Sequence, residues 1–242
     1  MSTPRESRTA ERILDVAERL VQTRGFNAFS YADVSKTLGI RKASLHHHYA
    51  TKAALGAALL ARYREAFVGE LARIERGPGD ALDRLERYVT LYGTVLRRGR
   101  MCMCGMLAAD VSTLPRAMRE SVASFFSENE AWLARVLAEG RRSGGLSFAG
   151  RPAAMADVFV SSLEGAMLVA RGGGKAQAFA TVADHLLGGI RPRRQSARST
   201  RRRLGRGRTL GTSSLKRPSL KSARMRSGST SSGKRKPRAN GP

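Results

Sequence analysis

The chain has 242 residues, of which 41% are hydrophobic, and its formal net charge is +25. This length allows one large domain or two small ones, and the charge implies a polyanionic partner, usually nucleic acid or an anionic membrane. Residues 191–242 hold 18 lysines and arginines without one acidic side chain, which leaves residues 1–190 with 26 basic and 19 acidic side chains, a net charge of +7. Most of the excess charge therefore belongs to a tail.

Neither membrane insertion nor a disulfide framework is expected. No stretch has the eighteen or so uninterrupted apolar residues of a membrane-spanning helix, and residues 1–12 are too polar for a signal peptide. The two cysteines, Cys102 and Cys104, are too few to staple a fold. We therefore expect a cytoplasmic protein without a membrane partner.

The first predicted element is a helix over residues 9–24. Thr9 can cap its N-terminus, and Gly25 can end it with the left-handed conformation that glycine adopts readily. Its apolar residues recur at helical spacing and form one face, at Ile13, Leu14, Ala17, Leu20 and Val21.

The second predicted helix covers residues 31–38. Ser30 can cap it, and Asp33, three residues later, completes a variant of the capping box with Asp in place of Glu. Gly39 follows this helix and suits a tight turn that needs a positive φ.

A third short helix is predicted at about residues 42–48, and with its predecessors it forms a helix-turn-helix unit. Val34 and Leu45 can supply the apolar contact that fixes the angle between the two short helices. Such a unit lays its second helix in the major groove of DNA. The outer face of that helix offers hydrogen-bonding side chains, as recognition requires: Lys42, Ser44, His46, His47 and, less centrally, His48.

Downstream, the chain is predicted to be helical to about residue 190. Thr51 can cap a long fourth helix, and no convincing period-two alternation indicates a strand. The predicted helices cover residues 51–75, 80–98, 101–111, 116–141, 152–171 and 175–188. Residues 191–242 are rich in Arg, Lys, Ser, Gly and Pro and are predicted to be disordered, because they cannot bury enough apolar surface to offset chain entropy.

The run from Phe29 to Leu55 resembles the DNA-binding signature of the TetR family of transcriptional regulators. The Arg-Ile-Leu-Asp stretch at 12–15 and the Arg-Gly-Phe at 24–26 match as well, so the resemblance covers about residues 9–55. The sequence departs from the usual family residues at four positions, which are Ala43, His46, Tyr49 and Ala53. Residues 99–115 also resemble one branch of the family at the start of its sixth helix.

The resemblance implies a set of DNA-binding residues around the third helix. Lys52 is expected to contact a phosphate, which would affect all DNA sequences alike. The implied set is Ser30, Tyr31, Arg41, Lys42, Ala43, Ser44, His46, His47, His48, Tyr49 and Lys52.

The resemblance also implies that residues 80–190 bind a small-molecule effector and dimerise. Glu164 stands out because a carboxylate on an apolar helix needs a partner or a polar ligand. The candidate pocket residues are Tyr88, Tyr92, Cys104, Met106, Phe125, Phe126, Trp132, Phe159, Glu164 and Met167, although aromatic residues at helical spacing are more often plain core. The expected dimer face lies on the last two helices, at Ala156, Val160, Leu163, Met167, Val182 and Leu186.

Metal binding and catalysis are not expected. Three consecutive histidines on a helix point about 100° apart, so His46, His47 and His48 cannot converge on one ion. Cys102 and Cys104 are expected as buried thiols, with pocket lining as a second reading and a thiol sensor as a third. No nucleophile–base pair, phosphate-binding glycine loop or carboxylate pair indicates an enzyme, and no cofactor is implied.

The sequence therefore predicts an all-α protein with three parts. Residues 1–50 form a helix-turn-helix DNA-binding domain, residues 51–190 form a ligand-binding and dimerisation domain whose first helix is the link, and residues 191–242 form a basic tail. The predicted function is a repressor that binds double-stranded operator DNA as a homodimer and is released by a small-molecule effector. The alternative is a nucleoid-associated or general nucleic-acid-binding protein that acts mainly through its tail.

Overall fold

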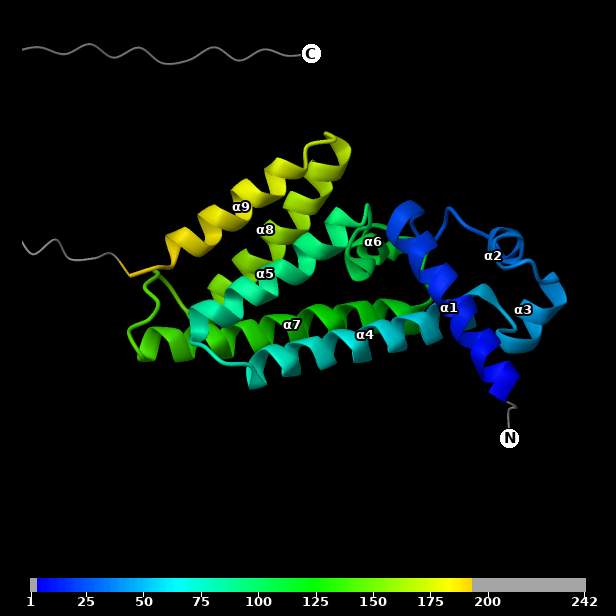
Figure 1. Ribbon diagram of the computed structural model, residues 1–242, viewed down its shortest axis with the longest axis horizontal. Helices are drawn as coiled ribbons and strands as arrows, with labels where there is room; N and C mark the ends of the chain where they lie inside the picture. Colours follow the sequence, from blue (N-terminus) through cyan, green and yellow to red (C-terminus); the bar gives the residue numbers. More distant parts are fainter. Residues whose placement is uncertain (1–3, 193–242) are drawn as a thin grey trace, which may run out of the picture. The chain divides into compact units, whose positions relative to one another are not determined.

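A computed structural model describes residues 4–192, and within this range the chain is helical and contains no strand (Figure 1). The elements in chain order are α1 (Pro4–Arg24), α2 (Tyr31–Leu38), α3 (Lys42–His48), α4 (Lys52–Arg76), α5 (Ala81–Arg97), α6 (Met103–Ala109), the short 3₁₀ helix η1 (Val111–Thr113), α7 (Arg116–Arg142), α8 (Pro152–Gly172) and α9 (Ala176–Gly189). The all-α prediction is confirmed. The predicted disorder of the basic tail falls outside the described residues.

Helix α1 begins earlier than predicted. It starts at Pro4, so Thr9 lies inside the helix and not at its N-cap. Proline suits a first helical position because its φ is already helical and its missing N–H would have no partner there. The predicted apolar face is correct, since all five of its residues are buried. Gly25 ends the helix as expected, with a φ of +93°.

The helix-turn-helix has the predicted bounds and local signals. The Asp33 carboxylate accepts hydrogen bonds from both the backbone N–H and the hydroxyl of Ser30, at 2.7 Å each. Gly39 ends α2 with a φ of +67°, which only glycine adopts without strain. Val34 and Leu45, the residues expected to fix the interhelical angle, are both fully buried, and α2 packs against α3.

Helices α4 to α9, with the segments that join them, form the helical body. Helix α7 packs against α4, α5 and α8, and α9 packs against α8 and α5 (Figure 1). By length and composition alone, α8 could cross a membrane. Three charged side chains interrupt its apolar sequence, so the sequence did not predict a membrane-spanning helix here. Its packing against α7 and α9 is that of a core helix.

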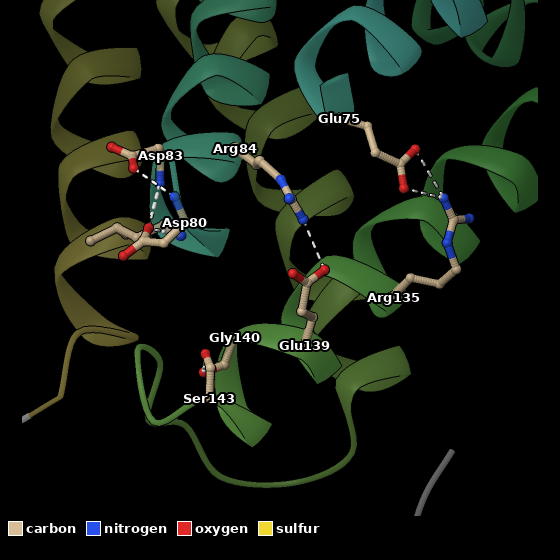
Figure 2. Close-up of polar contacts among 9 residues, drawn as sticks. Glu75, Asp80, Asp83, Arg84, Arg135, Glu139, Gly140 and Ser143 are labelled. Atoms are coloured by element: carbon tan, nitrogen blue, oxygen red, sulfur yellow. Dashed lines mark hydrogen bonds and ion pairs between the residues drawn. The ribbon is translucent and has the colours of Figure 1, made fainter. Parts of the chain in front are cut away.

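Polar contacts tie the ends of α4 and α5 that lie farthest from α1 to helix α7 (Figure 2). The guanidinium of Arg84 donates to Glu139 at 2.8 Å, and Arg135 donates to Glu75 at 3.3 Å. The start of α5 is closed by a reciprocal pair, in which the Asp80 side chain accepts from Asp83 N–H and the Asp83 side chain accepts from Asp80 N–H. These contacts hold the ends of three helices in one arrangement.

The C-terminal end of α1 is fixed to the body by backbone and side-chain hydrogen bonds. The carbonyl of Gln22 accepts from the Met101 N–H and from Arg171 of α8, both at 3.1 Å, and Arg171 also donates to the carbonyl of Thr23. The Asp110 carboxylate accepts from the Phe26 N–H at 2.8 Å. The helix that carries the DNA-binding unit is therefore held by residues from two parts of the body.

Candidate DNA interface and ligand cavity

The exposed face of α3 lies beside the N-terminus of α2. Lys42, His46 and His47 are exposed, Ser44 and His48 are half-buried, and Leu45 points inward. Arg41 and Ala43 are exposed as well, and Tyr49 is half-buried.

A hollow of about 390 Å³ brings five of the predicted DNA-binding residues together. Its lining is Phe29, Ser30, Tyr31, Ala32, Lys42, His46 and Lys52. The N-terminus of a helix favours an anion because its first N–H groups point outward, and two lysines stand beside it. This hollow has the chemistry that a DNA phosphate requires.

Contacts made by the side chains of Tyr31 and His46 stiffen the rim of the hollow. The Tyr31 hydroxyl donates to the Tyr49 carbonyl at 2.7 Å, and the Tyr31 ring lies 4.8 Å from the His46 ring between centroids. The imidazole Nδ1 of His46 is 3.0 Å from the carbonyl oxygen of Ala50. On the outer surface, His47 Nε2 lies 3.8 Å from a carboxylate oxygen of Glu6, in the first turn of α1.

Lys52 has a structural role that the sequence did not reveal. Its ammonium group donates to the Phe29 carbonyl at 2.6 Å and lies 4.7 Å and 4.5 Å from the ring centroids of Phe26 and Phe29. Burial lowers the pKa of Lys52, and the carboxylates of Asp110 and Asp33 oppose this shift. The side chain therefore joins the start of α4 to the loop between α1 and α2.

A cavity of about 980 Å³ lies between α4 and α5. Aromatic, apolar and charged side chains all contribute to its lining. Its lining is Asp15, Glu18, Arg62, Tyr63, Ala66, Phe67, Glu70, Arg73, Ile74, Gly77, Pro78, Arg87, Thr90, Leu91, Tyr92, Thr94, Val95, Arg98, Cys102 and Met167. Its size suits a small organic molecule.

Arg62 forms the wall of this cavity on the side of α1. One nitrogen of its guanidinium donates to Asp15 at 2.8 Å and to Glu11 at 3.3 Å, and the other donates to Glu18 at 2.8 Å. All three carboxylates belong to α1, so a single side chain of α4 both lines the cavity and holds the helix that supports the DNA-binding unit.

Only two of the predicted pocket residues, Tyr92 and Met167, line the cavity. The other eight lie elsewhere. Tyr88, Cys104, Phe125, Trp132 and Phe159 are buried in the core, Met106 and Phe126 are half-buried against it, and Glu164 forms a hydrogen bond with Cys102. Tyr63, Phe67 and Arg62 line the cavity but are absent from the predicted pocket, because the sequence indicates only a linking role for α4. The sequence signal for a cavity here was the spacing of these residues, which places them on one side of α4.

Both thiols are buried, as expected, and Glu164 lies beside them. Burial raises the pKa of Glu164 to about 7, and a hydrogen bond with Cys102 opposes this shift. Burial and the nearby carboxylate raise the pKa of both Cys102 and Cys104. Gly105 allows the close approach, because a Cβ at this position would clash with Glu164 Oε2. No group of three metal-binding side chains occurs among the described residues.

Comparison with known protein families identifies the family to which this chain belongs. Residues 13–59 match the model described as bacterial regulatory proteins, tetR family, and residues 81–186 match the tetracyclin repressor-like C-terminal domain. The chain belongs to the TetR family. The family resemblance inferred from residues 9–55 is thereby confirmed, and the TetR family is one of transcriptional regulators.

Several individual proteins resemble this TetR-family chain over most of its length. The HTH-type transcriptional repressor NemR of Escherichia coli K12 is 30% identical over 175 residues, which cover 71% of this chain and 88% of NemR. A TetR-family regulator from Agrobacterium tumefaciens has a TM-score of 0.75 and 33% identity, covering 77% of this chain and all of that one. The reduced form of E. coli NemR has a TM-score of 0.66 and 28% identity, covering 75% of this chain and 97% of that one. The nucleoid occlusion factor SlmA of Aliivibrio fischeri is 24% identical over 68% of this chain and 85% of SlmA.

The contacts of Lys52 predict that it supports the fold as well as DNA binding. We expect Lys52→Met to lower the free energy of unfolding by about 1–3 kcal/mol without DNA, because it removes a charged hydrogen bond and two cation–π contacts. Urea denaturation measures this change. Lys42→Met, on the exposed face of α3, is the matched control and should weaken DNA binding at unchanged stability. Equal stability of the two variants would limit Lys52 to phosphate contact.

Proposed function

We propose that this protein is a ligand-responsive repressor that binds operator DNA as a homodimer and is released by a small-molecule effector. The observation that carries this proposal is Arg62, which lines the ligand-sized cavity and pairs with three carboxylates of α1. A molecule in the cavity therefore contacts the same side chain that orients the DNA-binding unit. The repressor NemR, as a relative, supports the direction of control.

The proposed mechanism follows from two arrangements of α4 relative to α1. A ligand shifts the equilibrium only if it binds one arrangement more tightly than the other. We infer that residues 1–50 read DNA in the cytoplasm and that residues 51–190 bind the effector and dimerise. A ligand that displaces Arg62 or spreads α4 from α5 moves the two recognition helices of a dimer away from successive major grooves.

The dimer face that we propose differs from the one expected from the sequence. Ala156, Val160, Leu163 and Met167 are buried within the protomer and are not available to a partner, while Val182 and Leu186 are half-buried. The surface of α8 instead shows small and apolar residues at alternating spacings of four and three: Ala154, Val158, Ser161, Gly165, Leu168 and Gly172.

This α8 stripe has the periodicity of a coiled-coil seam, and its small residues allow two helices to approach closely. Val158 and Leu168 are 46% and 56% exposed, which is unusual for large apolar side chains in a protomer that has a well-formed core elsewhere. We infer that the stripe packs against its copy in a symmetric dimer, and such a dimer would read a pseudo-palindromic operator.

A second candidate function has its own support. The relative SlmA is named a nucleoid occlusion factor, and the tail of this chain carries 18 basic side chains without an acidic one. A nucleoid-associated protein that binds DNA mainly through residues 191–242 would need no operator.

The recognition face is tested by His47→Ala. We expect this variant to bind its operator more weakly by about 1–3 kcal/mol if the imidazole contacts a base, because each such contact contributes that much discrimination. The operator is first found by footprinting the wild-type protein on genomic fragments, and affinities are then measured by fluorescence anisotropy. His185→Ala, on α9, is the matched control. Unchanged affinity for His47→Ala, Ser44→Ala and Lys42→Ala together would remove α3 from the interface.

The α8 stripe is tested by Gly165→Arg. A Cβ at Gly165 meets nothing within 4 Å in the protomer, and arginine is a better helix former than glycine, so the subunit should fold normally. We expect a monomer at micromolar concentration by sedimentation velocity, with operator binding weakened at least tenfold. Gly69→Arg, at an equally open position on α4, should remain dimeric. A dimeric Gly165→Arg protein would place the interface elsewhere.

The role of the tail is tested by removing residues 193–242. Each phosphate neutralised by a Lys or Arg contributes a log–log salt slope of about −0.9, so the shortened protein should show a flatter salt dependence and weaker non-specific binding. Its preference for operator over random duplex should persist. Equal salt slopes would show that the tail does not contact DNA, and loss of all binding would favour the nucleoid-associated function.

A further inference from the structure

Four aromatic and amide side chains form a buried polar cluster between α5 and α7. The hydroxyls of Tyr88 and Tyr92 lie 3.2 Å apart, and the Asn129 amide donates to the Tyr92 hydroxyl at 3.0 Å. The Trp132 ring stacks on Tyr88 with 5.7 Å between centroids. All four side chains are at most 4% exposed, so water competes little for their polar atoms.

Three polar atoms around this cluster lack a hydrogen-bond partner within residues 4–192. They are Asn129 Oδ1, Trp132 Nε1 and Glu164 Oε1, two acceptors and one donor. Leaving a buried polar atom unsatisfied costs about 1–3 kcal/mol, so a ligand that supplies the missing partners gains affinity. Glu164 faces Tyr88, Tyr92, Cys102 and Cys104, none of which is a cation.

Two residues that line the cavity connect it to the cluster and to Glu164. Tyr92 and Cys102 line the cavity, and they are also the side chains that hydrogen-bond to Asn129 and Glu164 respectively. Phe67, another lining residue, has its ring centroid 6.5 Å from that of Tyr92. Tyr92 and Cys102 therefore stand between the cavity and the unsatisfied acceptors of Asn129 and Glu164, which do not themselves line it.

We propose that the cavity binds an organic amine in its protonated form, whose apolar body lies among the aromatic rings and whose N–H groups donate to Glu164 and Asn129 once the side chains of Tyr92 and Cys102 turn aside. This inference rests on the proposed ligand-responsive function and names the class of ligand. An ammonium group satisfies both acceptors, neutralises a buried carboxylate and is attracted to the faces of aromatic rings. Four arginines and three carboxylates line the cavity itself, and Arg62 and Arg73 pair with Glu18 and Glu70. The preference for a cation therefore comes from the two acceptors and not from the charge of the lining.

The single tryptophan of the chain, Trp132, reports on binding at this cluster. The full-length protein is titrated with 2-phenylethylamine, 2-phenylethanol and phenylacetate, which share one ring and differ in their head group, while the fluorescence of Trp132 is followed. We expect the amine to bind at least tenfold more tightly than the alcohol, and the carboxylate to bind most weakly.

The pH dependence follows from Glu164. Its pKa is about 7, and the carboxylate binds a cation only when it is ionised, so amine affinity should rise about tenfold between pH 6 and pH 8. The amine itself stays protonated over this range, as a lysine side chain does. The affinity of the alcohol should change little.

Two variants with a matched control locate the effect. Glu164→Gln keeps the shape of the side chain, and it should remove both the preference for the amine and its rise with pH. Asn129→Leu should weaken the amine by removing one acceptor. Glu65→Gln, the same change at an exposed position of α4, should behave as wild type. Circular dichroism confirms that each variant is folded.

Several results would overturn the assignment: equal affinity for the three probes, tightest binding of the carboxylate, no fluorescence change at millimolar amine, or an amine preference that survives Glu164→Gln. Operator binding by the same protein sample separates this proposal from the repressor function. A sample that binds its operator without any response to amines refutes only the ligand class. A sample that recognises no operator refutes the repressor function.

Discussion

The carbonyl end of α1 is the junction on which the rest of the structure depends. The last carbonyls of a helix have no partner within the helix, and here Met101 and Arg171 supply donors from the body. Because α1 also packs against α2, fixing its end fixes the orientation of the whole DNA-binding unit. Arg62 adds a second attachment near the middle of α1, so two separate groups of contacts hold α1 in the arrangement described here.

The cavity and the polar cluster show where stability is given up within an otherwise well-packed body. The core around α7 is aromatic and aliphatic, yet it encloses an amide and a carboxylate whose hydrogen-bonding capacity is only partly used. An apolar replacement of these groups would pack at no electrostatic cost. The amine recognition proposed above would account for their presence beside two residues that line a cavity of ligand size.

Local signals in the sequence predicted the DNA-binding unit well. The Ser30–Asp33 cap, the glycine at 39 and the buried pair Val34 and Leu45 each act over a few residues, and the structure contains all of them. The start of α1 was missed because capping residues are common inside helices too, and Thr9 gave no sign that the helix already began at Pro4.

The cavity and the outer face of α8 could not be predicted by the same means. Helix α8 is apolar on nearly every side, so periodicity does not distinguish Val160, which is buried, from Val158, which is exposed. Likewise, the spacing of Tyr88 and Tyr92 is equal to one helical turn, yet only Tyr92 reaches the cavity. Which side of a helix faces a cavity depends on how distant helices pack, and this information is not local.

The length of α4 has a mechanical consequence. The helix has 25 residues, and Glu75 near its last turn is tied to α7 while Lys52 at its first turn is tied to the DNA-binding unit. A rigid rod of this kind is about 37 Å long, so a tilt of only about 5° around the fixed end displaces the other end by about 3 Å. A displacement of this size approaches the rise of one base pair along duplex DNA, about 3.4 Å. In the proposed mechanism, a small expansion between α4 and α5 would thus be amplified into a change of register on the double helix.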